Sequence, residues 1–309
     1  MAKQSGDHDR FPAEALDRIA AQFPGRLGLY IEDLATGANH EYGAGHRLPT
    51  ASICKIPVMI ELFRQAEAGL LSLSERRRLS GDISTHGTGL LALLEDEPEL
   101  TLYDYCRLMI GVSDNMATDL LLDVVGVSSV NTTLDALGFV NTRTSMTMGR
   151  CHYLMAGMVD QPCTRQNDEI LLEHIRAGRI DPSSLPFQDG PQNNVTAPRE
   201  MGAILGQLYR GQIVSAPASA AMISLLKGCQ HRAMIPRHIA PDVAIAHKHG
   251  SSSRIKGDVG IVFLPTGPLI IAALALASRG ADGNAGADAI AEISRLTVAA
   301  LSPESTNQD

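Results

Sequence analysis

A serine and a lysine in the tetrad Ser52-Ile53-Cys54-Lys55 have the types and the spacing that nucleophilic catalysis needs. The segment 57–71, which follows closely, has the apolar periodicity of a helix. Residues three apart lie on one face of a helix, so the Lys55 amine can reach the Ser52 hydroxyl. Serine is a weak nucleophile until a neighbouring base accepts its proton, and lysine becomes such a base when burial or another cation lowers its pKa.

The tetrad alone is a weak indication of catalysis, because residues 224–227 and 253–256 have the same S-x-x-K spacing. The tetrad at Ser52 differs in being followed by two further polar clusters. The first is Ser113-Asp114-Asn115, inside a segment with helical periodicity. The second is Lys248-His249-Gly250, at the end of a predicted strand and followed by three serines. We therefore take Ser52 as the candidate nucleophile.

These three clusters, in this order, resemble the S-x-x-K, S-D-N and K-T-G motifs of the class A β-lactamases and penicillin-binding proteins. The resemblance extends over most of residues 27–145 and 195–277. Four segments resemble the first hairpin, the central helix pair, the approach to the active-site loop and the following helix of that family: 27–37, 108–120, 137–143 and 195–201.

The resemblance implies a role for each polar residue of the three clusters. Ser52 attacks the substrate carbonyl and becomes acylated, Lys55 accepts its proton, and Ser113 passes a proton to the leaving nitrogen. Lys248 holds Ser113 and attracts a substrate carboxylate. The backbone N–H groups of Ser52 and Ser251 form the oxyanion hole, which stabilises charge that develops in the transition state. Further substrate contacts are expected from Asn115, His249, Gly250, Ser251 and, in a loop at the edge of the cleft, His86.

The sequence departs from class A β-lactamases at the residue that helps to hydrolyse their acyl-enzyme. In that family a glutamate holds the hydrolytic water five residues after the arginine matched by Arg143, and here this position is Met148. The active-site loop, about 144–195, is also longer. Either Lys55 serves both steps, or another base acts, or the acyl-enzyme is hydrolysed slowly. Candidate bases are loop residues otherwise expected to be solvated: His152, Asp160, Asp168, Glu169 and His174.

A second departure is a histidine in place of threonine in the third motif. His249 can donate a hydrogen bond to a substrate and can titrate near neutral pH, although it could also simply face solvent. Arg232 and Arg237 precede this strand, and one of them could bind a substrate carboxylate, as an arginine does in many relatives. Surface charge is the simpler interpretation of both. Asp114 is expected to be structural rather than chemical.

The composition excludes several classes of protein. The chain has 309 residues, of which 44% are hydrophobic and 19% charged, enough for one large domain or two closely packed ones. A net charge of −8 with scattered basic residues indicates no nucleic-acid binding. We expect no membrane segment and no secretory leader, and hence a cytoplasmic protein, or a periplasmic one if a leader has been removed. The five cysteines form no C-x-x-C pair, and we expect neither a metal nor another cofactor.

The hydrophobic patterns predict strands towards both ends of the chain and helices between them. One of these predicted helices begins after Thr196, which is expected to cap it. The other expected elements are strands at 26–34, 39–43, 243–247, 259–264 and 269–276, and helices at 13–22, 57–71, 101–125, 128–137, 168–177 and 284–301. With the resemblance, this predicts an α/β fold of the β-lactamase/transpeptidase type. Residues 1–50 and 196–309 form an antiparallel five-stranded sheet with flanking helices, residues 51–195 form an all-helical part, and the site lies between them.

We therefore expect a serine hydrolase that opens a β-lactam or another small amide through a Ser52 acyl-enzyme. The C–N bond that it cleaves is not an ordinary peptide bond, and its substrate is a small molecule with a carboxylate. The missing glutamate and leader favour a metabolic amide or ester over an antibiotic. Alternatives are an esterase or acyltransferase on the same scaffold, a penicillin-binding or sensor domain without turnover, and a peptidoglycan carboxypeptidase, which would require export.

Overall fold

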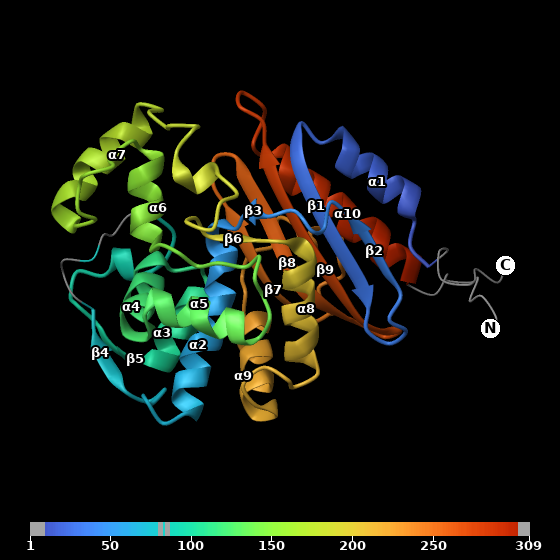
Figure 1. The fold of residues 1–309 in the computed structure, drawn as a ribbon, viewed down its shortest axis with the longest axis horizontal. Coiled ribbons are helices and arrows are strands. Elements are labelled where there is room, and N and C mark those ends of the chain that lie inside the picture. Colours follow the sequence, from blue (N-terminus) through green and yellow to red (C-terminus); the bar gives the residue numbers. More distant parts are fainter. Residues whose placement is uncertain (1–9, 80–82, 84–86, 302–309) are drawn as a thin grey trace.

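The computed structural model of the chain describes residues 10–79, 83 and 87–301. Its centre is a sheet in the order β2-β1-β9-β8-β7, in which every neighbouring pair is antiparallel (Figure 1). The strands are β1 (Gly25–Asp33), β2 (Asn39–Tyr42), β7 (Ile245–Ser251), β8 (Ile255–Leu264) and β9 (Gly267–Ala277). Both ends of the chain thus contribute to one five-stranded sheet, which confirms the predicted fold class.

Helices cover both faces of this sheet and form a further layer beside it (Figure 1). Helices α1 and α10 pack on one face and α8 on the other, with the helical part beyond α8 and α9. The helices are α1 (Ala13–Gln22), α2 (Lys55–Glu67), α3 (Leu102–Gly111), α4 (Asn115–Val125), α5 (Val127–Ala136), α6 (Met148–Met155), α7 (Asp168–Arg176), α8 (Pro198–Tyr209), α9 (Ala216–Lys227) and α10 (Ala285–Leu301). Two short strand pairs complete the architecture: β3 (Leu48–Pro49) with β6 (Val195–Thr196), and β4 (Arg76–Arg78) with β5 (Glu99–Thr101).

The central strand β9 shows how one sheet serves two hydrophobic cores. It is apolar along almost its whole length, as expected for a strand that is covered on both faces. Side chains alternate between the two faces of a strand. Ile270 and Ala272 accordingly belong to the core shared with the helical part, whereas Ile271 and Ala273 belong to the core under α1 and α10.

Helix α2 runs through the middle of the helical part. All of its residues from Lys55 to Phe63 are buried, because α3, α4, α5 and α9 pack around it. A buried charge needs partners. The Glu61 carboxylate finds them in Arg64 Nε at 2.7 Å and the Thr133 hydroxyl at 2.6 Å. The start of α2, and the Ser52–Lys55 tetrad with it, is therefore held in place by the surrounding helices.

The predicted helix over 101–125 is instead two helices, α3 and α4. The break lies at Ser113, whose φ of +59° is incompatible with a continuing right-handed helix. Asp114 then caps α4, because its Oδ1 accepts a hydrogen bond from the Ala117 N–H at 2.9 Å. The interruption places the second motif at a helix junction rather than on a helix face.

The predicted cap of α8 is also wrong. Thr196 lies in β6, where its hydroxyl shares a 2.8 Å hydrogen bond with that of Thr142, and Ala197 occupies the cap position without a side-chain hydrogen bond. The boundaries that we predicted at 50 and 195 for the two parts of the molecule stay a prediction. Among the described residues, no helix is long and apolar enough to cross a bilayer.

Candidate active site

Ser52 lies on a tight turn that leads directly into α2. Residues Ala51–Cys54 form one turn of 3-10 helix, and α2 begins at Lys55. Ala51 has a φ of +43°, in the left-handed region that residues with a Cβ rarely adopt, and such strain often accompanies functional sites. Ser52 is 7% exposed and lines a pocket, so its hydroxyl is accessible in a fixed place.

Lys55 is completely buried and makes three hydrogen bonds through its amine. Its Nζ donates to the backbone oxygen of Ser113 at 2.7 Å, to Ser113 Oγ at 3.1 Å and to Asn115 Oδ1 at 2.7 Å. The left-handed conformation of Ser113 allows its backbone oxygen and its hydroxyl to meet the same amine. The first two predicted motifs therefore meet in space.

The third motif reaches the same hydroxyl from the sheet. Lys248 is completely buried in β7, and its Nζ donates to Ser113 Oγ at 3.1 Å and to the backbone oxygen of His249 at 2.9 Å. Lys248 lies within the strand rather than at its end, because β7 continues to Ser251. The Ser113 hydroxyl oxygen thus lies between two lysine amines, one from the helical part and one from the sheet.

Burial lowers the pKa values of both lysines, and the charge of Lys248 lowers that of Lys55 further. Burial lowers the pKa of Lys55 to about 7, and the positive charge of Lys248 adds to this effect. Burial also lowers the pKa of Lys248 to about 8. The acceptors around Lys55 are neutral oxygens rather than carboxylates, so its ammonium form receives little compensation. Lys55 is therefore suited to accept a proton near neutral pH while Lys248 keeps its charge.

Gly250 allows β7 to approach the turn that carries Ser52. A Cβ at this glycine would lie 2.2 Å from the backbone oxygen of Thr50 and 3.1 Å from the backbone nitrogen of Ser52. Only glycine permits this approach. As a result Ser251, the next residue of β7, lines the same pocket as Ser52. Gly250 itself lies behind the pocket wall, where it fixes the spacing of the two segments.

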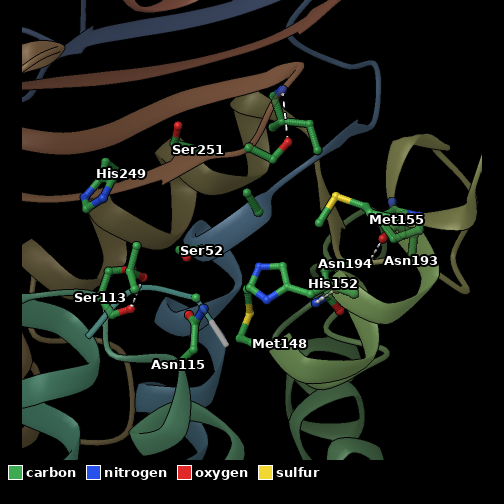
Figure 2. Close-up of a pocket in the computed structure, with 17 residues that line it drawn as sticks. Ser52, Ser113, Asn115, Met148, His152, Met155, Asn193, Asn194, His249 and Ser251 are labelled. Carbon is green, nitrogen blue, oxygen red and sulfur yellow. Dashed lines mark hydrogen bonds between the residues drawn. The ribbon is translucent and has the colours of Figure 1, made fainter. Parts of the chain in front are cut away.

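The pocket has a volume of about 140 Å³ and opens to solvent. Figure 2 shows Ser52 between two walls, with His249 and Ser251 on the β7 side and Met148 and His152 on the α6 side. The remaining lining residues are Ala51, Gly87, Thr88, Ser113, Asn115, Cys151, Met155, Pro186, Asn193, Asn194, Ser252 and Ile255. Of the predicted substrate contacts, Asn115, His249 and Ser251 thus line the pocket, whereas His86 lies outside the described residues.

His249 does not titrate near neutral pH, contrary to our expectation. Its ring stacks on His231 with the centroids 3.8 Å apart and the planes at 13°. Burial, followed by the charge of Lys248, lowers the pKa of His249 far below its ordinary value. The imidazole is therefore neutral and offers a substrate a hydrogen bond rather than a charge.

The start of α6 is anchored by a residue that the sequence did not single out. Asp119 accepts hydrogen bonds from the backbone N–H groups of Met148 at 2.6 Å and Gly149 at 2.8 Å. Burial raises the pKa of this carboxyl to about 6. The Met148 side chain is buried, with its sulfur 3.8 Å from Cys54 Sγ. Where the family places its glutamate, this chain therefore has an apolar side chain on an anchored backbone.

Of the five candidate bases in the loop, only His152 lines the pocket. Asp168 is buried and accepts a hydrogen bond from the Tyr153 hydroxyl at 2.9 Å, and His174 Nδ1 lies 2.8 Å from the backbone oxygen of Ala156. The other two, Asp160 and Glu169, are exposed on the surface. His152 follows Met148 by four residues on α6, so the two lie on one helix face.

The remaining sequence candidates lie away from the pocket. Arg232 is exposed and Arg237 pairs with Asp288 on α10, so neither lines it. In the other two S-x-x-K segments, the lysines have separate contacts. Lys227 lies over the Phe263 ring at 4.1 Å, and Lys256 Nζ donates to the backbone oxygen of Ser252 at 2.6 Å.

Comparisons with known proteins find relatives over nearly the whole chain. A profile described as the Beta-lactamase enzyme family matches residues 12–301. A β-lactamase of Rhodobacter capsulatus is 23% identical over 296 residues, which cover 94% of this chain and 89% of that protein. The structure of a β-lactamase from Sphaerobacter thermophilus has a TM-score of 0.75 and 28% identity, covering 94% of this chain and 96% of that one. A mutant of PBP-A, solved as an acyl-enzyme complex with penicillin G, has a TM-score of 0.73 and 21% identity, covering 93% and 95% of the two chains.

The close approach of β7 to the Ser52 turn predicts a sharp effect of Gly250→Ala. The added Cβ must move the strand by roughly 1 Å, which we expect to slow acylation of Ser52 about 100-fold. The rate of labelling by a fluorophosphonate probe measures this. Gly111→Ala is the matched control, because its Cβ would meet its nearest neighbour at an ordinary 3.5 Å. Equal labelling rates in the two variants would contradict the assigned role of Gly250.

The two lysine pKa values predict a bell-shaped pH dependence of acylation by a carboxylate-bearing substrate. The rate rises with pH as Lys55 loses its proton around pH 7, and falls as Lys248 loses its charge above about pH 8. Stopped-flow measurement of acylation between pH 5 and pH 10, at roughly unit steps, tests this. In Lys248→Met the falling limb should disappear, and its persistence would rule out Lys248 as its origin.

Proposed function

Since the chain belongs to the Beta-lactamase enzyme family, we propose that it hydrolyses a β-lactam or a related small amide through an acyl-enzyme on Ser52. The observation that carries this proposal is the Ser113 hydroxyl, which lies 3.1 Å from both Lys55 Nζ and Lys248 Nζ. Ser52 lines the same pocket as Ser113, so this serine has a proton acceptor, a proton donor and a fixed positive charge close to its pocket.

The proposed acylation uses these groups in sequence. Neutral Lys55 accepts the Ser52 proton as the serine oxygen attacks the carbonyl carbon. The backbone N–H groups of Ser52 and Ser251 stabilise the oxyanion. The C–N bond then breaks, and Ser113 passes a proton to the leaving nitrogen. Lys248 holds Ser113 and attracts the substrate carboxylate, for which His249 supplies a neutral hydrogen bond.

The pocket wall supports a substrate with an apolar group beside the amide. Met148 and Met155 line one side, with Pro186 and Ile255 nearby. Asn115 lines the pocket together with Ser113. Its side chain accepts a hydrogen bond from Lys55 and can also hydrogen-bond with the substrate amide. Such apolar walls with a few convergent polar groups are typical of pockets for small molecules. We therefore propose a small, carboxylate-bearing lactam or amide rather than a polymer.

The nucleophile is tested by intact-protein mass spectrometry. After exposure to penicillin G and, separately, to a fluorophosphonate, we expect wild type to gain one adduct and Ser52→Ala to gain none. Ser224→Ala is the matched control, because this exposed serine begins another S-x-x-K segment and should leave labelling unchanged. Full labelling of Ser52→Ala would end the proposal. Parallel assays with an ester and a peptide distinguish an esterase or a carboxypeptidase on the same scaffold.

For the second step we propose His152 as the base that activates the hydrolytic water. It faces the pocket from the α6 wall, one helical turn after Met148 (Figure 2). His152→Gln should acylate normally but lose its adduct on the order of 100-fold more slowly. His174→Gln, in the same loop but outside the pocket, is the control for loop stability.

The lifetime of the adduct also separates hydrolysis from penicillin binding without turnover. The apolar Met148 favours this second function, because it replaces the acid that class A enzymes use. An adduct that persists for hours in wild type would support the binding function and remove the proposed role of His152. If the adduct decays equally fast in wild type and in His152→Gln, the base that activates the water is another group, such as Lys55.

A further inference from the structure

A second cluster of reactive side chains lies on the opposite face of β7 from Lys248. His247 and His249 alternate with Lys248 along the strand, so they face away from its amine. His247 is buried, and its Nδ1 lies 2.8 Å from Oδ1 of the buried Asp258 on β8. Asp258 Oδ2 in turn accepts a hydrogen bond from the Ile235 N–H at 3.0 Å. The carboxylate is therefore fixed, and it holds the His247 ring in one orientation.

Cys229, which follows α9, completes this cluster. Its Sγ lies 3.7 Å from His249 Nδ1, and the His247 ring acts against burial to lower the pKa of its thiol. A thiol near an imidazole that is held by a carboxylate is the arrangement that activates nucleophilic cysteines on many folds.

The charges around the cluster favour a thiolate. Burial opposes a charge on His247, but Asp258 outweighs it and raises the pKa of His247 to about 10. Burial opposes the thiolate too, yet the nearby His247 ring and the charge of Lys248 lower the pKa of the Cys229 thiol below its ordinary value. The other titratable groups facing the cluster are His231, His249 and Lys256.

We propose that Cys229, His247 and Asp258 form a covalent modification site, separate from Ser52, at which the cysteine reacts with hydrogen peroxide to give a sulfenic acid. The sulfur attacks one peroxide oxygen, so that an S–O bond forms and the O–O bond breaks. The sulfur loses two electrons and the peroxide gains them. The departing oxygen takes the proton of the His247 imidazolium and leaves as water. Thiolates beside a protonated histidine are oxidised selectively in this way.

The chain contains a matched internal control. Cys163 is half-buried like Cys229, but burial raises the pKa of its thiol, whereas Cys54, Cys106 and Cys151 are buried. Exposure alone therefore predicts similar reactivity of Cys163 and Cys229. The cluster predicts that Cys229 reacts faster by on the order of tenfold near pH 7, since an ordinary thiol is only a few per cent ionised there.

The test treats the full-length protein with submillimolar hydrogen peroxide and dimedone, followed by peptide mass spectrometry at each cysteine. We expect the dimedone adduct on Cys229, its loss in Cys229→Ser and its retention in Cys163→Ser. His247→Gln and Asp258→Asn should each slow its formation. If these variants fold poorly, the proposal is tested on wild type by measuring the rate of iodoacetamide alkylation at Cys229 and at Cys163 as a function of pH. We expect the rate at Cys229 to reach its inflection at a lower pH than the rate at Cys163. Equal rates at the two cysteines, or an inflection at or above that of Cys163, would overturn the proposal.

Discussion

The arrangement of the site depends on burying two lysine amines against one hydroxyl oxygen. Removing an ammonium group from water costs several kcal/mol unless other groups compensate. Here the acceptors of Lys55 are a backbone oxygen, a hydroxyl and an amide oxygen, all neutral. The chain therefore stabilises the charged form of both amines only in part, and their pKa values are lowered as a result. A serine nucleophile needs such a partner, because only an amine that has given up its proton can accept the proton of the serine.

This constraint explains local features that otherwise look unrelated. The left-handed Ser113 breaks a helix so that its backbone oxygen and hydroxyl both face Lys55. Gly250 removes the side chain that would keep β7 away from the Ser52 turn. The alternation of side chains along β7 directs Lys248 towards Ser113 and its two neighbouring histidines towards Cys229. One strand thereby contributes to the surroundings of two nucleophiles, and His249 belongs to both because it also lines the Ser52 pocket.

The sequence was most informative where residue identity and order are themselves the signal. Ser52, Lys55, Ser113 and Lys248 could be chosen from their motifs, and the apolar run at 269–276 indicated a strand, which is β9 in the structure. Features that depend on tertiary contacts could not be predicted. The break at Ser113 interrupts a segment with continuous helical periodicity. Asp119 becomes an anchor only because the α6 backbone lies beside it, and Cys229 meets His249 only because the end of α9 packs beside β7.

The most direct test of the account is a ¹³C NMR titration of the Lys55 side chain, in wild type and in Lys248→Met. The account predicts a pKa near 7 for Lys55 in wild type, and a higher value when the neighbouring positive charge is removed. A wild-type value close to the ordinary 10.5, or a value that does not respond to Lys248→Met, would contradict the claim that the two buried amines act on each other through one site.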